Sequence, residues 1–353
     1  SGTCGHPLRR TFACLGDPVN LAARLMSKAP ARSVLVTGEV AAAADDKYVW
    51  AEREPMALKG KSEPVTAFSL SGVRRGKVRR HSRYPLPMVG REREITFVEN
   101  RLQSALSGQR RVVGIMADAG LGKSRLVAEV VRKMRAGGHR VVFGEAQAFG
   151  TNSSYLAWRE PWRALFDLDG GLGEEEQRAR VEQSLAGLAA GHAMRAPLLN
   201  SLLELEIPNN PVTAAFDPKL RKASLESLLS DVLLAELKQR PLVIVLEDCH
   251  WIDEASLDLL EVLVRDTATA PLLVVIAYRS EIDAKDRTRL MSIPTFEELL
   301  LEELTTEDMH RVISAKLEQQ FGGSVAAAPA VVDLVVERGQ GNPFYIEEII
   351  SYL

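Results

Sequence analysis

The sequence predicts an α/β fold: an open parallel sheet with helices on both faces, followed by a helical lid. Four near-continuous apolar runs, at 111–116, 140–146, 241–248 and 271–279, predict the strands. Runs that lack the alternation of a half-exposed strand are typical of strands covered on both faces. Segments with helical spacing separate these runs, and strands that alternate with helices favour a parallel sheet. The segment after Leu301 has helical spacing only and predicts the lid.

Composition and charge limit the class of protein. The chain has 353 residues, which is enough for about two domains. Its net charge of −3 gives no global basic field, so a nucleic-acid partner is not expected. No apolar run approaches the roughly 20 residues that a membrane span needs, and we expect no membrane partner. Cys4, Cys14 and Cys249 lie far apart without metal-ligand spacing, which fits a reducing, cytoplasmic compartment.

A basic stretch divides the chain. Residues 73–87 are rich in arginine and contain Pro85 and Pro87, a composition that cannot bury a core and predicts a linker. The linker separates a short N-terminal piece, residues 1–72, from a core over 88–300 and a lid over 301–353. A basic segment can also bind an acidic partner, and composition leaves that alternative open.

The motif ADAGLGKS, from Ala117 to Ser124, follows the first apolar run and precedes a helical pattern. It matches G-x-x-x-x-G-K-[ST] except that Ala117 replaces the first glycine. In such a loop the backbone N–H groups cradle phosphates, the lysine reaches the outer phosphates and the hydroxyl ligates Mg²⁺. An ordinary glycine-rich helix start is the alternative. The residues predicted to hold the nucleotide here are Ala119, Gly120, Leu121, Gly122, Lys123, Ser124 and Arg125.

Charged residues end the next two strands. Glu247 and Asp248 follow the third apolar run, and Arg279 follows the fourth. The carboxyl ends of parallel strands meet at the edge of the sheet where α/β folds bind ligands. One carboxylate would hold Mg²⁺, the other would orient an attacking water, and Arg279 would read the γ-phosphate. The alternatives are acids that merely end a buried strand and a salt bridge between Arg279 and Glu281.

Two nearby groups of residues have structural interpretations beside functional ones. His250, Trp251 and Asp253 could be sensor groups, but Trp251 also fits a packing role and Asp253 an N-cap before the helix that starts at Glu254. In GNPF, Asn342 fits a helix cap and Pro343 the first helical position.

Five motifs in order resemble the signal-transduction ATPases of the STAND class, a branch of the AAA+ superfamily. They are MVGREREI (88–95), the phosphate loop, VIVLEDCHWID, AYRSE and RGQGNPFYIEEI (338–349). The resemblance covers most of residues 88–353 and implies a P-loop NTPase that binds ATP and switches a helical lid. The family often has Asp-Asp or Asp-Glu where this chain has Glu247-Asp248, so the choice of metal ligand stays open. The residues that the resemblance places beside the adenine or over the nucleotide are Val89, Gly90, Arg91 and Pro343.

The N-terminal piece resembles the closing part of class III adenylyl and guanylyl cyclase domains. The resemblance lies in TFACLGDPVNLAARL (11–25) and MALKGKSEPVTAFSL (56–70). It implies that Asn20 orients the substrate ribose and that Arg24, one helical turn later, stabilises the triphosphate. An amphipathic helix is the alternative. The family's metal-binding aspartates and adenine-reading lysine precede this segment, so we expect a small α+β remnant with an incomplete cyclase site.

These observations predict the ATP-binding and ATP-hydrolysing regulatory module of a soluble signalling protein like adenylate cyclase, with ATP and Mg²⁺ as cofactors. The implied partners are ATP, the missing part of the cyclase domain or a second cyclase domain, and further copies in an ATP-dependent homo-oligomer. A hydrolytically inert ATP-bound scaffold is one alternative. A nucleic-acid-remodelling AAA+ ATPase is another, and the net charge weighs against it. The upstream signal, the oligomeric state and the activity of the parent cyclase stay open.

Overall fold

The computed structural model describes residues 2–6, 9–13, 16–30, 33–44, 48–58, 64–73, 88–148, 154–168, 172–189, 191–321 and 329–352. The chain divides into two compact units, residues 1–78 and 79–353. The predicted linker lies outside the described residues except for Val73, which ends a strand. Over the described ranges, none of the helices combines the length and the apolar character that a membrane crossing requires.

The first unit combines helices with antiparallel strands. A three-stranded sheet has the order β3-β5-β4, and β1 pairs with β2 in a separate hairpin. Its small core contains Leu25, Leu58 and Ala67. Pro18 lies in the first turn of α1, where the missing N–H of proline costs no helical hydrogen bond. The elements are β1 (Gly2–His6), β2 (Arg9–Ala13), α1 (Asp17–Lys28), β3 (Leu35–Thr37), α2 (Gly38–Ala43), β4 (Tyr48–Glu52) and β5 (Ala67–Val73).

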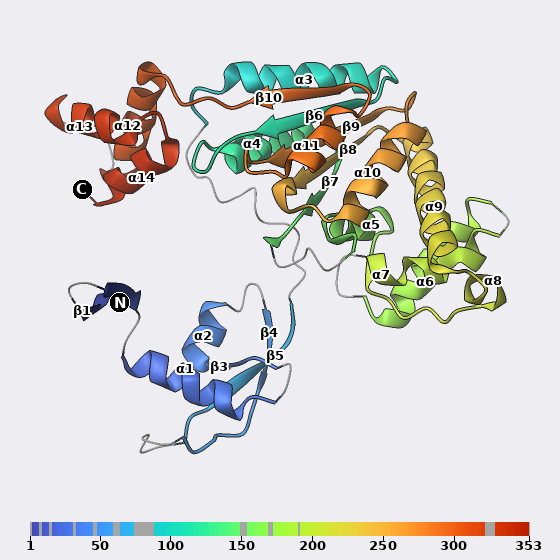
Figure 1. Cartoon of the computed structure of the whole chain (residues 1–353), viewed down its shortest axis with the longest axis horizontal. Coiled ribbons are helices and arrows are strands. Elements are labelled where there is room, and N and C mark those ends of the chain that lie inside the picture. Colours follow the sequence, from blue (N-terminus) through green and yellow to red (C-terminus); the bar gives the residue numbers. More distant parts are fainter. Residues whose placement is uncertain are drawn as a thin grey trace. The chain divides into compact units, whose positions relative to one another are not determined.

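The second unit is built on a parallel sheet of five strands in the order β10-β6-β9-β8-β7 (Figure 1). The four predicted strands are present, and a fifth, β10, was not predicted because its sequence FEELL carries two glutamates. Among the described strands β10 pairs with β6 alone, at the edge of the sheet, where half-buried polar residues are tolerated. The strands are β6 (Arg111–Met116), β7 (Arg140–Glu145), β8 (Leu242–Glu247), β9 (Leu272–Tyr278) and β10 (Phe296–Leu300).

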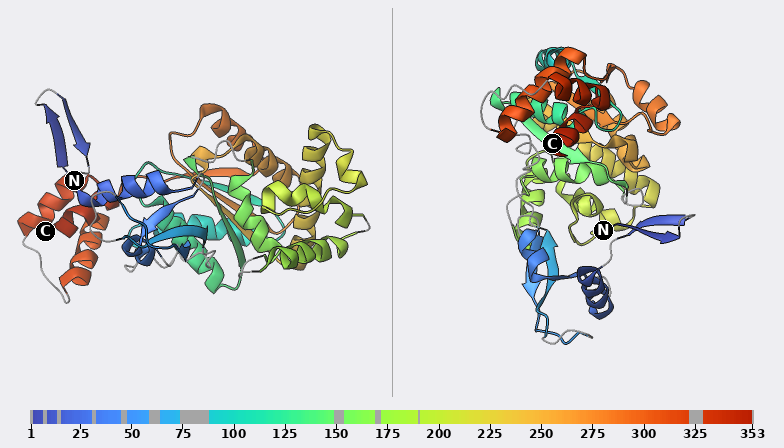
Figure 2. Two further views of the ribbon diagram at one scale, coloured as in Figure 1. Left: turned by 90° about the horizontal axis from the view of Figure 1, so that it is seen from below. Right: turned by 90° about the vertical axis from the view of Figure 1, so that its left-hand side faces the viewer.

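Helices cover both faces of this sheet, as the apolar runs predict (Figure 2). Val243 and Val245 of β8 face the core formed with α3 and α4, whereas Ile244 and Leu246 face the core formed with α5, α6, α9 and α10. Both cores need apolar residues at successive strand positions, which explains the continuous runs. The helices are α3 (Glu92–Leu106), α4 (Lys123–Ala136), α5 (Arg159–Leu165), α6 (Glu174–Ala186), α7 (Asn200–Leu203), α8 (Pro211–Ala214), α9 (Pro218–Gln239), α10 (Glu254–Asp266) and α11 (Ala284–Met291), with 3-10 turns at Leu156–Trp158, Ala193–Leu199 and Cys249–Trp251.

The segment after Leu301, which the sequence predicts to be a lid, contains α12 (Thr306–Phe321), α13 (Pro329–Gly339) and α14 (Pro343–Tyr352), and we call these three helices the lid. These helices, red in Figure 1, share a core of their own that includes Ile313, Val335 and Ile346. The lid therefore has a separate hydrophobic core from the sheet and can hold its internal packing while its contacts with the sheet change.

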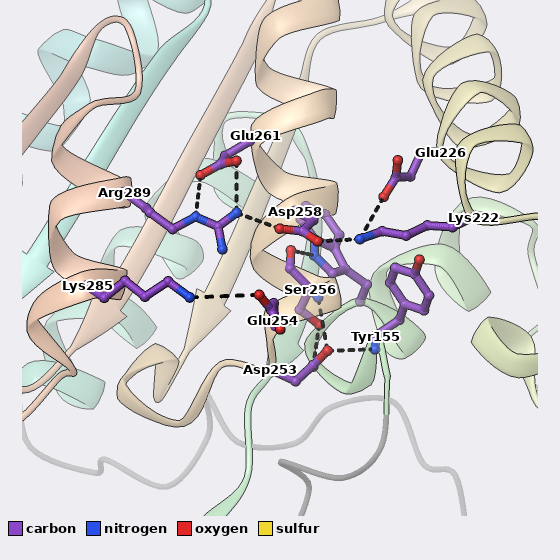
Figure 3. A network of polar contacts seen from close by, with 11 residues as sticks. Tyr155, Lys222, Glu226, Asp253, Glu254, Ser256, Asp258, Glu261, Lys285 and Arg289 are labelled. Carbon is purple, nitrogen blue, oxygen red and sulfur yellow. Dashed lines mark hydrogen bonds and ion pairs between the residues drawn. The ribbon is translucent and has the colours of Figure 1, made fainter. Parts of the chain in front are cut away.

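A polar network fixes α10, the helix that follows the acidic strand end (Figure 3). Asp253 caps α10 by accepting hydrogen bonds from Ser256 N (2.9 Å) and Ser256 Oγ (2.6 Å). The same carboxylate accepts a bond from Tyr155 N at 3.1 Å. The predicted capping role of Asp253 is confirmed, and its carboxylate also ties the segment after β7 to α10.

Ion pairs then join α10 to its two neighbouring helices (Figure 3). Asp258 of α10 accepts from Arg289 of α11 at 2.6 Å and also pairs with Lys222 of α9. Arg289 donates a further bond to Glu261 at 2.8 Å. Together these contacts join α9 and α11 to α10.

Candidate functional site

The predicted phosphate loop connects β6 to α4 at the carboxyl edge of the sheet. Ala117 is buried, does not have a positive φ, and donates its N–H to Tyr278 O at 3.2 Å. It thus prolongs the pairing of β6 with β9 and does not need the left-handed conformation that favours glycine. This explains why alanine is accommodated where the motif usually has glycine.

The two later glycines of the loop adopt backbone conformations that favour glycine over other residues. Gly120 has a φ of 84° and Gly122 a φ of 86°, in the left-handed region that disfavours side chains. A Cβ on Gly120 would also lie 2.6 Å from Asn342 Oδ1. Gly122 is the residue before α4, so the turn ends at a helix N-terminus, where free N–H groups and the helix dipole favour an anion.

Lys123 begins α4 and meets the acidic strand end. Its side chain is 7% exposed, and its Nζ lies 3.1 Å from Asp248 Oδ1. Glu247 is the last residue of β8 and is buried. Ser124 follows on α4, and its hydroxyl has no hydrogen-bond partner in the part of the chain that the structure describes. The structure therefore brings Lys123 to Asp248 of the acidic pair, although 125 positions separate the two residues in the sequence.

Arg279 follows β9 and lies against an aromatic ring. Its Cζ is 5.9 Å from the centroid of Trp251, and the ring of Trp251 is 4.2 Å from that of His250. The alternative ion pair with Glu281 does not form within the described ranges. Burial lowers the pKa of His250 below its usual value, which favours the neutral imidazole. Trp251 packs on His250 as expected but stays 37% exposed, at the surface of the site.

The first turn of the second unit packs on the lid. Val89 lies against the lid's core. Gly90 has a φ of 71°, and a Cβ there would lie 2.4 Å from the carboxyl carbon of Asp308 in α12. Both residues therefore contact the lid.

Arg91 is buried, with 5% exposure, and its guanidinium makes three polar contacts. It donates to Leu121 O at 3.3 Å, to Glu302 O at 2.6 Å and to Glu94 Oε1 at 2.9 Å. The first contact lies in the phosphate loop and the second directly before the lid. The side chain is thus engaged by the protein itself.

The GNPF motif reaches the phosphate loop from the lid. α14 starts at Pro343, and Asn342 Oδ1 accepts from Phe344 N at 3.0 Å, so the capping interpretation is confirmed. Asn342 Nδ2 also donates to Ala119 O at 3.2 Å, and Phe344 N lies 3.4 Å from Gly120 O. One residue caps the lid helix and contacts the loop.

Glu302 and Glu347 make contacts near the loop and were not predicted from the sequence. Arg125 of α4 pairs with Glu347 of α14 at 2.9 Å, and Glu302 supplies the carbonyl that Arg91 binds. Nothing in the local sequence marks either glutamate, because each contact joins segments more than 200 positions apart.

Asn20 and Arg24 lie in the first unit. Both are on α1, one turn apart; Asn20 is exposed and Arg24 is half-buried. One nitrogen of Arg24, Nη1, is buried and has no hydrogen-bond partner among the described residues. Across the described parts of the chain, no three His, Cys, Asp or Glu residues gather as a metal centre.

The chain matches a protein family and is similar to several longer proteins. The profile of the family described as AAA ATPase domain matches residues 87–275. An uncharacterized protein of Rhizobium meliloti is 29% identical over 96% of this chain and 32% of its own length. Adenylate cyclase type 10 of Oryctolagus cuniculus is 21% identical over 100% of this chain and 22% of its own length. A STAND protein with a tetratricopeptide repeat sensor from Pyrococcus horikoshii has a TM-score of 0.38 at 14% identity, over 77% of this chain and 33% of that one. The chain thus spans a third or less of the length of these relatives.

Proposed function

Because this chain belongs to the AAA ATPase domain family, we propose that residues 88–353 form a module that binds ATP and hydrolyses it slowly with Mg²⁺ to switch the lid. The observation that carries the proposal is the buried Lys123, held 3.1 Å from Asp248 at the start of the helix that follows the loop. A lysine and a strand-end acid at one helix N-terminus are the groups that bind and activate a nucleotide triphosphate.

The residues at this place fit a magnesium ion. Mg²⁺ prefers hard oxygen ligands, and the hydroxyl of Ser124 and the carboxylates of Glu247 and Asp248 supply them. Ser124 lies one residue after Lys123, and its hydroxyl is free within the described part of the chain. When bound, the ion would neutralise phosphate charge; which acid holds it is open.

The chain's own residues would bind the phosphates and orient the attacking water. The N–H groups of the loop and the Lys123 ammonium would hold the phosphates, and the acid not engaged with the metal would orient a water for attack. Arg279 carries five N–H donors and makes no hydrogen bond or ion pair within the described ranges, so its guanidinium is free to bind the γ-phosphate.

Phosphate release tests hydrolysis. Glu247→Gln and Asp248→Asn keep the side-chain shapes and remove the charges. We expect at least one of them to bind ATP and release no phosphate. An amide can neither act as a base that orients the attacking water nor neutralise the charge of the metal ion. Normal turnover by both variants would contradict the assigned chemistry. ATP binding without turnover by the parent would favour the inert scaffold.

We further propose that the first unit is the closing part of a class III cyclase domain and that the whole protein is a cyclase-linked signalling protein of the STAND type. Support comes from the motif around Asn20, from the unsatisfied Nη1 of Arg24, and from the full coverage of this chain by adenylate cyclase type 10. In the full-length protein, Arg24→Ala should lower cyclic AMP production and leave ATP hydrolysis by the module intact. Unchanged cyclic AMP production would refute the assignment.

A further inference from the structure

Three successive carbonyls of the phosphate loop are held from outside the loop. The carbonyl of Ala119 accepts from Asn342 Nδ2 at 3.2 Å, and that of Gly120 from Phe344 N at 3.4 Å. The carbonyl of Leu121 accepts from Arg91 Nη2 at 3.3 Å. Two donors therefore come from the start of α14 and the third from the turn before α3.

Holding these carbonyls fixes the direction of the N–H groups. In a trans peptide the carbonyl and the following N–H point to opposite sides of the chain. With the carbonyls of residues 119–121 turned toward α14 and Arg91, the N–H groups of Gly120 and Gly122 point away from them. Leu121 N is partly used, since it lies 3.5 Å from Asp118 O. Glycines at positive φ have many other conformations available, so a loop that contains two of them needs such external contacts to keep one arrangement.

Arg91 links this loop to the entry of the lid. The nitrogen that donates to Leu121 O also donates to Glu302 O, at 2.6 Å, four residues before α12 begins. A lid that swings away from the sheet would have to break this contact or pull the guanidinium from the loop. The half-buried pair of Arg125 with Glu347 adds a second contact between the start of α4 and α14.

We propose that Asn342 and Arg91 are positioning residues that hold the phosphate loop from its carbonyl side, so that the loop is shaped to bind phosphate only while the lid is seated. The proposal rests on the proposed function, because it assigns these residues a part in ATP binding. ATP would then favour the seated lid through its higher affinity for that arrangement. Release of the lid would in turn disorder the loop and release the nucleotide.

Asn342→Ser is the central test. Serine keeps a capping oxygen for α14 but lacks the amide N–H that reaches Ala119 O. Arg91→Lys is the second variant, because an ammonium keeps the charge but cannot present the planar fork that binds two carbonyls and Glu94 together. The matched control is Asn210→Ser: Asn210 caps α8 through Oδ1 and donates Nδ2 to Met194 O at 2.7 Å, remote in sequence from the loop.

We call the contacts of Asn342 and Arg91 with the carbonyls of the phosphate loop the clamp. Hydrogen exchange of the nucleotide-free protein tests the clamp in the absence of ATP. In Asn342→Ser and Arg91→Lys we expect the amides of Leu121 and Leu126, which donate to Asp118 O and Gly122 O, to exchange faster than in the parent, while those of β6 and β9 keep their rates. ATP affinity, measured by calorimetry, should fall about threefold to tenfold, the usual effect of one lost hydrogen bond. Asn210→Ser should match the parent in both measurements.

The two measurements separate the inference from the function it rests on. Unchanged exchange at the amides of Leu121 and Leu126 in both variants would overturn the clamp, whatever the affinities. Faster exchange with unchanged ATP affinity would overturn its role in binding. If the parent fails to bind ATP, the proposed function falls, and the role in nucleotide binding falls with it, whereas faster exchange would still establish the contact as a clamp.

Discussion

Asp248→Asn should make the nucleotide-free site bind ATP more tightly when no metal is present. In the structure Asp248 Oδ1 holds the buried Lys123 at 3.1 Å, so incoming phosphates must compete with this carboxylate for the ammonium. A hydrogen bond that involves charged groups contributes about 1.5 to 3 kcal/mol when buried. Because Asp248 is 23% exposed, we take a lower value of about 1 kcal/mol, which corresponds to roughly fivefold tighter binding. Removal of a negative charge beside the phosphates acts in the same direction.

Calorimetry with ATP in the presence of EDTA measures this effect, since chelation removes any contribution of the acid to metal binding. Glu247→Gln is the control, because it removes a neighbouring charge and keeps the carboxylate of Asp248 that pairs with Lys123. We expect Asp248→Asn to gain more affinity than the control under EDTA and to lose that advantage when Mg²⁺ is added. If Asp248→Asn binds ATP no more tightly than the parent under EDTA, the view that the acid restrains the lysine is wrong.

Two further predictions concern stability. Gly144→Ala should lower the free energy of unfolding by about 2 kcal/mol or more, because the added Cβ would lie 1.9 Å from Ala157 O. Gly187→Ala is the control and should change this free energy little, because the nearest atom to its added Cβ would be at 3.6 Å. Equal urea midpoints for the two variants would contradict the close packing at Gly144. Burial, followed by the nearby acids, raises the pKa of Tyr155 to about 12, so the folded state keeps a proton that the unfolded state loses near pH 10. The stability that this group contributes is present below pH 10 and is lost as the pH rises to about 12. The Tyr155→Phe variant should therefore lose less stability than the parent between these pH values. Equal losses of stability in the two proteins would refute the raised pKa of Tyr155.

The sheet and its ligand edge were predictable because both follow from local patterns. The runs at β6, β7, β8 and β9 are apolar at every position that two cores require, and the loop motif lies directly between a strand and a helix. β10 escaped because its glutamates are satisfied by residues distant in sequence. Glu297 accepts from Arg101 at 3.1 Å and Glu298 from Tyr278 at 2.6 Å, and the local sequence does not reveal either partner.

The convergence of Lys123 and Asp248 was predictable from the rule that parallel strands end at one edge. The way in which the lid docks on the phosphate loop was not predictable. The resemblance places Arg91 beside the adenine, but the side chain is buried in contacts whose partners depend on how the lid docks. Asn342 was predicted as a cap, and its second hydrogen bond, to Ala119, depends on the same docking.

The most direct test of ATP binding by the phosphate loop is a calorimetric titration of the parent and of Lys123→Ala with ATP and Mg²⁺. The Lys123 ammonium is the main side-chain charge that would face the phosphates, and its loss should lower ATP affinity by at least about tenfold, or about 1.4 kcal/mol, without lowering the melting temperature to the same degree. Equal ATP affinity of the two proteins would contradict the assignment of this loop as the nucleotide site.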